Sequence, residues 1–332
     1  FTAWWPSEKL AVRGYVEVLR HYREIVGIRR QLKNSLLADK PDLFIGVDAP
    51  DFNLDLEGDL RAAGIKTVHF VAPAVWAWRP ERIEKIRRSV DHMLCIFPFE
   101  PALLAQAGIA ATYVGHPLAQ TIPMQPDRLA ARQALGLDAQ RPVVAVLPGS
   151  RQSEIEHLTP RFVQAAQIMQ RQNPALQFVL PAIPSLQARI QALIDAQGGV
   201  PGLQLLQGQS HTALAACDLT LIASGTATLE AALFKRPMVI AYNMNWLSWQ
   251  IMKRQQLQPW VGLPNILSQD FVVPEYLQDQ ATPAALAQAT QRWLDDAPAA
   301  AALQARFTEL HHQLNRDTAR LATDAIAQVV AA

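Results

Sequence analysis

The chain carries, from Asp218 to Pro237, the stretch Asp-Leu-Thr-Leu-Ile-Ala-Ser-Gly-Thr-Ala-Thr-Leu-Glu-Ala-Ala-Leu-Phe-Lys-Arg-Pro, and this stretch decides the fold. Residues 219–223 form a short apolar run with β-branched character, which is typical of a buried parallel strand. Residues 224–226, Ser-Gly-Thr, interrupt the run with small side chains that favour a tight turn. Residues 228–234 are rich in Ala and Leu and predict a helix that ends before the proline.

A strand, a small-residue turn and a helix in this order direct backbone N–H groups and the positive end of a helix dipole at an anion. We therefore predict that the turn holds the diphosphate of a nucleotide. The alternative is an ordinary βα connection whose Ser and Thr only cap the helix, because such connections are common in α/β proteins.

A second loop of similar character follows another apolar run. Residues 143–147 predict a buried strand, and Gly149, Ser150 and Arg151 come directly after it. The turn offers flexible backbone, and a guanidinium suits phosphate oxygens. Both loops are predicted at carboxyl ends of strands in one sheet, which strengthens the case for an anion site. The Gly-x-Gly-x-x-Gly fingerprint and the Walker A sequence are absent, so neither of those single-loop sites is predicted.

Length and composition indicate two α/β domains. The 332 residues exceed one typical domain, and half of them are apolar, so each half can bury a core. Strand and helix patterns alternate in both halves, which predicts a doubly wound parallel sheet in each. The formal net charge of +1 argues against a dedicated nucleic-acid-binding protein. Cys95 and Cys217 lie in apolar runs and are expected to be buried thiols of a reducing compartment.

The N-terminal stretch is unusual for an α/β domain. It opens on Phe1 and continues into an amphipathic helical pattern over residues 10–37, with no strand before it. We expect that an N-terminal part has been lost, or that the chain is joined to an upstream segment. The start does not resemble a signal peptide, and no apolar run approaches the roughly 20 residues of a membrane span. The sequence therefore predicts a soluble or peripheral protein.

The first half offers a candidate general base. Residues 43–47 predict a buried strand, and Asp48 follows at its carboxyl end, the edge that faces the ligand in open α/β sheets. A carboxylate there can accept a proton from a substrate hydroxyl. The alternative is that Asp48 or Asp51 caps the helix predicted over residues 54–63. Further strands of this half are predicted over residues 66–71, 93–97 and 111–114.

Other polar residues at strand ends are binding candidates. Trp76, Trp78 and Arg79 stand in one loop, which can line a pocket for an apolar or sugar ligand while the guanidinium meets an anion. His116 follows the fourth predicted strand and either touches substrate or has a structural role. Asn265 stands in a turn that is placed near a strand end or crevice.

The last third of the chain offers less chemistry. Residues 243–260 combine aromatic and apolar side chains with adjacent cations, which suits either a segment resting on an anionic bilayer or a packed amphipathic helix. Residues 283–332 predict Ala/Gln/Leu-rich helix, and His311 and His312 are expected at the surface. No Cys/His cluster has the spacing of metal ligands.

Seven stretches of the sequence together resemble a known family. They are Gly46-Val-Asp-Ala-Pro-Asp-Phe-Asn53, Val75-Trp-Ala-Trp-Arg79, Phe97-Pro-Phe-Glu100, Val114-Gly-His116, Leu147-Pro-Gly-Ser-Arg151, Ala223-Ser-Gly-Thr-Ala-Thr-Leu-Glu230 and Leu263-Pro-Asn265. In this order they closely resemble the lipid-A-disaccharide synthases, inverting glycosyltransferases of Gram-negative outer-membrane biogenesis. The resemblance extends nearly end to end, and the first and sixth stretches are the most specific.

The resemblance implies a GT-B architecture of two facing Rossmann-like domains. Residues 1–135 would be the acceptor-side domain without its first strand and loop, residues 136–305 the UDP-sugar domain, and residues 306–332 a helix crossing back. The implied reaction moves 2,3-diacylglucosamine from its UDP conjugate to the 6-hydroxyl of 2,3-diacylglucosamine 1-phosphate and releases UDP, without metal or cofactor. The family's location is cytoplasmic and peripheral to the inner membrane, and a homodimer is left open.

The resemblance also assigns roles position by position. Asp48 matches the proposed general base, Glu230 would contact the ribose, and Asn265 lines the donor site. His116 and Arg79 remain candidates for substrate contact. The diphosphate site would be formed by the two turns, which contribute Gly149, Ser150, Arg151, Ser224, Gly225, Thr226, Ala227 and Thr228.

The sequence departs from the family in two places. The opening strand and its Gly-Glu-Ala/Thr-Ser-Gly-Asp loop are missing before the segment that matches residues 10–19, so a first domain without one core strand, and with doubtful activity, is expected. Arg13 stands where the family commonly has Met. Rival interpretations are an epimerase or a peptidoglycan-type transferase of the same UDP-sugar fold, and an inactive nucleotide-binding fragment.

Overall fold

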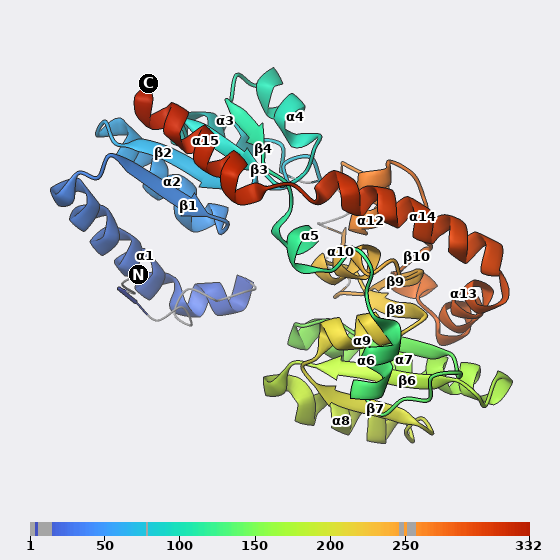
Figure 1. Cartoon of the computed structure of the whole chain (residues 1–332). Coiled ribbons are helices and arrows are strands. Elements are labelled where there is room, and N and C mark those ends of the chain that lie inside the picture. The colour runs from blue at the N-terminus through green and yellow to red at the C-terminus, as the bar shows by residue number, and fades with distance from the viewer. Residues whose placement is uncertain (1–3, 6–14, 78, 246–248, 251–256) are drawn as a thin grey trace. The chain divides into compact units, whose positions relative to one another are not determined.

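The computed structural model of the chain divides into two compact units (Figure 1). Unit 1 comprises residues 1–115 and 317–332, and unit 2 comprises residues 116–316. The structure describes residues 4–5, 15–77, 79–245, 249–250 and 257–332, and in the first helix it describes side chains from residue 22 onward.

Unit 1 is built on a parallel sheet of order β1-β2-β3-β4. The strands are β1 (Leu43–Val47), β2 (Lys66–Phe70), β3 (His92–Cys95) and β4 (Ala111–Tyr113). The helices are α1 (Tyr15–Asp39), α2 (Pro50–Ala62), α3 (Arg82–Ser89), α4 (Glu100–Gln106) and α15 (Thr318–Ala331). Met93 and Cys95 of β3 pack with α2, α3 and α4, whereas Leu94 packs with Ala325 of α15, because successive strand residues point to opposite faces. Unit 1 is therefore a sheet covered by helices on both faces.

Strand β1 is more exposed than predicted. Ile45 is 42% exposed and Val47 is 57% exposed, so the prediction of a buried strand is wrong. Both side chains share a face with Leu43, and α15, which covers that face, contacts β2, β3 and β4. β1 lies at the edge of the described sheet, and on this face Leu43 packs with the α15 side chains while Ile45 and Val47 remain exposed.

Unit 2 is built on a six-stranded parallel sheet of order β10-β9-β8-β5-β6-β7. The strands are β5 (Val143–Leu147), β6 (Gln177–Ala182), β7 (Leu203–Gln207), β8 (Leu219–Ala223), β9 (Met238–Tyr242) and β10 (Glu275–Leu277). The helices are α5 (Pro117–Thr121), α6 (Arg128–Ala134), α7 (Gln152–Gln172), α8 (Gln187–Ala196), α9 (Ser210–Ala216), α10 (Thr226–Leu233), α12 (Leu263–Ser268), α13 (Pro283–Asp295) and α14 (Ala297–Leu314), with short 3-10 turns at Pro184–Leu186 and Gln278–Gln280. The core joins these strands to α7 and α13.

Cys95 in unit 1 and Cys217 in unit 2 are buried free thiols, as predicted.

The strand order of unit 2 reverses between β5 and β8. From β5 the chain proceeds through β6 to β7 at one edge, and it then returns to β8 on the other side of β5. Leu147 at the end of β5 is in register with Ile222 of β8. In open α/β sheets, ligands bind outside the carboxyl ends of the strands at such a reversal. The two loops predicted to bind an anion leave these two strands.

The contact-based division falls at 115/116 and 316/317, whereas the sequence-based boundaries are 135/136 and 305/306. Helix α6 lies in unit 2 because buried Arg132 donates from Nε to the carbonyl of Ala216 at 2.9 Å and from Nη2 to Asp218 at 2.6 Å. The backbone N–H of His116 donates to the carbonyl of Leu314 at 2.9 Å, which keeps the end of α14 in the same unit.

His311 in α14 is fully buried, so the prediction of a surface position is wrong for this residue, whereas His312 is exposed. The Nε2 atom of His311 lies 2.7 Å from the carbonyl oxygen of Ala119, and its Nδ1 atom lies 2.6 Å from Nζ of Lys235. Burial lowers the pKa of Lys235 to about 8 and also lowers the pKa of His311. A neutral imidazole can therefore donate to the carbonyl and accept from the ammonium at once.

Candidate active site

The N-terminus of α10 is open at the strand-order reversal. Gly225 is the N-cap residue, with φ 145° and ψ −164°, and no side chain caps the helix there. This conformation is readily available only to glycine. Gly225 and Thr226 are exposed and Ala227 is half-buried. The first-turn N–H groups and the positive end of the helix dipole can therefore receive an anion.

The hydroxyls near this turn shape it and do not cap the helix. Ser224 Oγ donates to the carbonyl of Val261 at 2.8 Å, and Thr228 Oγ1 donates to the carbonyl of Gly225 at 2.7 Å. Thr228 is fully buried. The alternative in which Ser and Thr merely cap an ordinary helix does not hold, because both side chains bond to carbonyl oxygens.

Glu154 occupies the backbone donors of the second loop. Its Oε2 accepts from the N–H of Ser150 at 3.0 Å and of Arg151 at 3.2 Å, and its Oε1 accepts from Arg151 Nη1 at 2.8 Å. A Cβ on Gly149, whose φ is +115°, would lie 2.5 Å from Glu154 Oε2, so only glycine fits there. The backbone N–H groups of Ser150 and Arg151 are therefore already occupied in this structure. The accessible anion-binding group is the Arg151 side chain, which is 57% exposed.

The sequence contained a signal for this cap that residue-type reasoning missed. Glu154 stands three residues after Arg151, the N-cap position of α7, and a Glu at this spacing commonly reaches back to the N-cap backbone. Tyr242, at the carboxyl end of β9, is a neighbour of this loop that sequence analysis did not single out. The charge of Glu154 raises its pKa and that of Arg151 lowers it. Burial is the main cause of the raised pKa of Tyr242.

Asn265 braces the neighbouring loop instead of exposing its amide. Its Nδ2 donates to the carbonyl of Val273 at 2.9 Å and to Glu275 Oε1 at 2.8 Å, and its Oδ1 accepts from the N–H of Val272 at 2.9 Å and of Val273 at 3.0 Å. A side-chain amide has two donors and two acceptor positions, and all four are used. Asn265 is fully buried, so this geometry gives it a positioning role rather than direct contact with the donor.

Glu275 completes the brace from β10, a strand that sequence patterns did not predict. Its carboxylate accepts from the N–H of Val261 at 2.9 Å and of Gly262 at 2.8 Å. The same Val261 accepts from Ser224, so one chain of hydrogen bonds links β10 to the α10 turn. Burial raises the pKa of Glu275, while these hydrogen bonds oppose the shift.

Glu230 faces a histidine that sequence analysis did not single out. Its Oε2 lies 3.5 Å from Nε2 of His211 in α9, and the imidazole packs edge-on against Phe234. Burial raises the pKa of Glu230, and the histidine opposes this shift. The Glu230 side chain is 20% exposed and the His211 side chain 43%. Both can therefore still approach a small polar ligand.

In unit 1 the structure separates the two acids of the loop after β1. The described residues offer no hydrogen-bond or ion-pair partner to the exposed Asp48 carboxylate, whereas Asp51 pairs with Arg82 at 2.6 Å. The N-cap of α2 is Ala49 and carries no side-chain cap, so neither aspartate fills that predicted role. Asp48 and Ala49 both have positive φ, 50° and 43°. Non-glycine residues held there store strain, which is concentrated at functional sites.

Trp76 belongs to the interior of unit 1 and does not line an open pocket. It is 8% exposed, its ring packs edge-on against Phe97 and Phe99, and its Nε1 donates to Glu100 Oε1 at 3.1 Å. The other Glu100 oxygen, Oε2, accepts from the N–H of Ile96 at 3.1 Å and of Phe97 at 3.0 Å. Two of the family-like stretches thus pack on each other through one buried carboxyl group.

The remaining predicted contacts have mixed outcomes. His116 is buried, its Nδ1 accepts from the N–H of Leu118 at 3.2 Å, and burial lowers its pKa to about 4, so it serves as a neutral cap of α5. Arg79 is half-buried, engaged in polar interactions and held at φ 55°. Trp78, Arg13 and most of residues 246–256 lie outside the described residues.

Neither a metal site nor a membrane span is found in the described parts of the chain. Among those residues, no group of three or more His, Cys, Asp or Glu side chains is arranged to hold a metal ion. The helices that the structure describes include none with the length and apolarity needed to cross a membrane.

Comparison with solved structures identifies the fold. The UDP-GlcNAc 2-epimerase of Neisseria meningitidis, solved with UDP-GlcNAc, is similar with a TM-score of 0.62 and 11% identity over 96% of this chain and 83% of that chain. A trehalose-phosphate synthase from Burkholderia vietnamiensis is similar with a TM-score of 0.57 and 16% identity over 98% and 82%. At such low identity these similarities identify only the fold. That fold is GT-B, with two Rossmann-like domains.

Sequence comparison identifies the family. The profile of the lipid-A-disaccharide synthetase family matches residues 1–330. The lipid-A-disaccharide synthase of Albidiferax ferrireducens is 70% identical over 99% of this chain and 86% of that protein, and that of Verminephrobacter eiseniae is 64% identical over 100% and 86%. These matches favour the synthase over an epimerase or a peptidoglycan-type transferase. The chain belongs to the lipid-A-disaccharide synthase family of glycosyltransferases.

Proposed function

We propose that this chain transfers 2,3-diacylglucosamine from its UDP conjugate to the 6-hydroxyl of 2,3-diacylglucosamine 1-phosphate. The products are the tetraacyl disaccharide 1-phosphate and UDP. The observation that carries the proposal is the uncapped N-terminus of α10 at the strand-order reversal, in a member of a disaccharide synthase family. A nucleotide diphosphate is the anion that suits this position.

Leaving-group stabilisation is assigned to unit 2. As the bond between the anomeric carbon and the diphosphate oxygen breaks, UDP takes the electron pair and its negative charge grows. The first-turn N–H groups of α10 and the exposed guanidinium of Arg151 can stabilise that charge without reorganising. Glu154, by filling the N–H groups of the other loop, directs the diphosphate toward α10.

Proton removal is assigned to Asp48 of unit 1. The 6-hydroxyl oxygen of the acceptor attacks the anomeric carbon from the face opposite to UDP, and its proton passes to the carboxylate. Attack from that face inverts the anomeric configuration. An exposed carboxylate without a described partner is available as a base, whereas Asp51 is engaged by Arg82.

A disaccharide-forming assay with both acylated sugars tests the proposal. Asp48→Asn is expected to lower kcat by 10²-fold or more while leaving the donor Kd nearly unchanged, since an amide cannot take the proton. Asp51→Asn, three residues away, is the matched control and should retain most activity. Equal rates for Asp48→Asn and the unaltered chain would remove the general-base assignment, and no product from the unaltered chain would overturn the proposed reaction.

The diphosphate site is tested separately by UDP binding. Arg151→Ala removes a charge-assisted contact of about 1.5–3 kcal/mol, so the Kd for UDP should rise about tenfold or more. Arg189→Ala is the control, because Arg189 is a similarly exposed arginine of unit 2 that pairs with Glu156. An unchanged Kd in Arg151→Ala would mean that the diphosphate lies elsewhere.

We further propose that the chain acts at the cytoplasmic surface of the inner membrane as a peripheral protein. Acylated substrates and the aromatic and basic residues of 243–260 support this location. Trp246→Ser combined with Trp249→Ser should weaken flotation with anionic liposomes. Unaltered partitioning of that double variant would assign the segment to a packed helix instead.

A further inference from the structure

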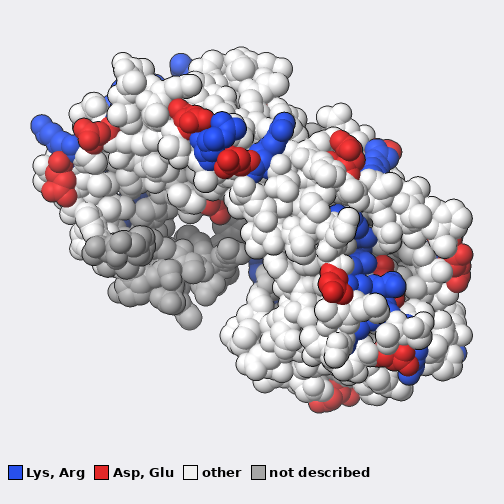
Figure 2. Space-filling model, viewed as in Figure 1, with Lys and Arg blue, Asp and Glu red and all other residues white. Residues whose placement is uncertain are grey.

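Unit 2 contains a basic cavity at the amino-terminal edge of its sheet, the edge opposite to the α10 turn. The cavity has a volume of about 410 Å³. Pro142 and Pro237, which immediately precede β5 and β9, lie in its wall together with residues of α6, α13 and α14. Figure 2 shows Lys and Arg side chains gathered in a hollow on this part of unit 2. None of these residues takes part in the reaction assigned above.

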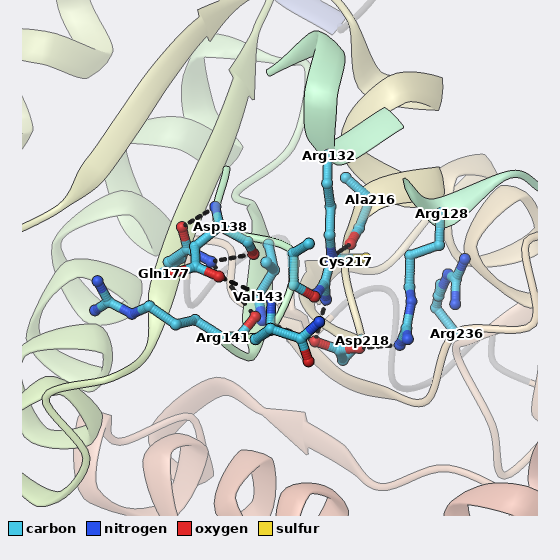
Figure 3. A network of polar contacts seen from close by, with 12 residues as sticks. Arg128, Arg132, Asp138, Arg141, Val143, Gln177, Ala216, Cys217, Asp218 and Arg236 are labelled. Atoms are coloured by element: carbon cyan, nitrogen blue, oxygen red, sulfur yellow. Dashed lines mark hydrogen bonds and ion pairs between the residues drawn. The ribbon is translucent and has the colours of Figure 1, made fainter. Parts of the chain in front are cut away.

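Three guanidinium groups meet at this cavity. Figure 3 shows Arg128 and Arg132 reaching Asp218 and Arg236 beside Arg128, whereas Arg141 points away from them. The Arg141 guanidinium instead donates to the carbonyls of Ala175 and Pro174. Its charge is therefore not counted among those that face the cavity. Among the described residues that line the cavity, Asp218 is the only acid. Three cations and one carboxylate leave an excess of two positive charges.

The single carboxylate is already shared. Asp218 accepts from Arg128 Nη1 at 2.7 Å, from Arg132 Nη2 at 2.6 Å and from the N–H of Val143 at 2.8 Å. Arg236 is 8% exposed and donates to two neutral carbonyls, Leu214 at 2.8 Å and Ala215 at 2.8 Å. A nearly buried cation without a carboxylate of its own is unfavourable unless a counter-charge compensates it.

Helix capping explains part of this cluster but not all of it. Arg132 and Arg236 donate to the carbonyls of residues 214–216 at the C-terminal end of α9, a favourable position for cations. Arg128 makes no such contact and is 49% exposed above Asp218. Burial is the main cause of the lowered pKa of Arg236; Asp218 opposes the shift, and Arg128 and Arg132 add smaller lowering contributions. Arg128, which pairs with Asp218 but is half exposed, is therefore the guanidinium that a ligand can reach from solvent.

We propose that this cavity is a second anion site that binds a phosphate-bearing molecule. A phosphate dianion matches the excess of two charges, and guanidinium groups bind phosphate oxygens through paired donors. The cavity is larger than a phosphate group alone requires. Trp293 and Leu294 form an apolar wall against which the part of the molecule that carries the phosphate can pack. The Trp293 ring is fixed by its Nε1 bond to the carbonyl of Met238 at 3.1 Å.

Calorimetric titration of the full chain with pyrophosphate tests the proposal, at constant ionic strength and with UDP saturating the other site. We expect one binding event that Arg128→Gln weakens about tenfold without changing the UDP affinity. Ala301→Glu places a carboxylate at the exposed rim from α14 and should weaken binding similarly. Arg189→Gln is the control, because Arg189 is 50% exposed and pairs with Glu156 as Arg128 pairs with Asp218.

A parallel flotation assay with phosphatidic acid vesicles distinguishes a lipid-borne phosphate from a soluble one. Binding that depends on Arg128 in either assay supports the site and identifies the source of the phosphate. Absence of binding in both assays would overturn the proposal. So would binding that Arg128→Gln and Ala301→Glu leave at the level of the Arg189→Gln control.

Discussion

The stability of unit 1 should fall as pH rises from about 5 to 8, because of one buried carboxyl group. Glu100 is 2% exposed, and burial raises its pKa to about 7 against an ordinary value of 4.5, although Trp76 and the N–H groups of Ile96 and Phe97 oppose the shift. Between these two values the folded chain holds a proton that the unfolded chain has released. The stability therefore declines through this interval, because raising the pH favours the unfolded state, which has already released its proton.

The size of the effect follows from the difference between the two pKa values. About 2.5 units at 1.36 kcal/mol each correspond to about 3 kcal/mol of stability, fully lost once the pH exceeds the folded pKa of about 7. Glu100→Gln cannot ionise, so the variant should lack this slope. Wild-type stability relative to the variant should therefore decline by about 3 kcal/mol between pH 5 and pH 8.

Hydrogen exchange of the Ile96 and Phe97 amides is the direct assay, since both donate to this carboxyl group. Protection factors, corrected for the intrinsic pH dependence of exchange, give the local opening free energy at each pH. Glu81→Gln, at an exposed position of the same unit, is the control and should keep the wild-type slope. Parallel pH profiles for wild type and Glu100→Gln would refute the reasoning, because they would show that Glu100 does not change its ionisation in this range.

Two further predictions concern unit 2. Asn265→Ala removes all four hydrogen bonds of the amide and leaves the N–H groups of Val272 and Val273 buried without partners, so it should cost about 2–4 kcal/mol and lower the Tm of unit 2 in calorimetry. An unchanged Tm with lost UDP binding would instead indicate direct ligand contact. Because burial raises the pKa of Glu230, protonation at acidic pH should weaken its acceptance of a ribose hydrogen bond, so the Kd for UDP should increase as pH falls toward that raised pKa. Titration calorimetry of Glu230→Gln should show this pH dependence removed, and a retained dependence would place its origin in another group.

Sequence patterns captured the local architecture of both units. Short apolar runs followed by small residues and Ala/Leu-rich helices predicted six of the described strands, β1 to β5 and β8, to within a few residues, and they placed Gly225 at a strand-to-helix turn. Strand β10 was missed because three half-buried residues carry too little periodicity to stand out. The burial of β1 was overestimated, since an apolar run does not reveal whether a helix covers its strand.

Tertiary structure decided how the candidate residues are used. Asn265 and Trp76 share the polar or aromatic character expected of binding residues, yet each is committed to partners elsewhere in its unit. His311 is buried by contact with Lys235, 76 positions earlier in the chain. Such pairings depend on which elements pack together, and periodicity along the chain carries no information about them.

The sequence by itself therefore determined the strands, the turns and the family, because these follow from patterns within a few neighbouring residues and from motifs in a defined order. The Glu154 cap follows from a spacing within the sequence, whereas only the tertiary structure decided that the α10 turn remains open. The tertiary structure also assembled the arginine cavity from segments as far apart as Arg128 and Gln304, which are 176 positions apart in the chain. The physical reason is that hydrogen-bond satisfaction and local charge are properties of packed neighbours in space, and the chain acquires those neighbours only when it folds.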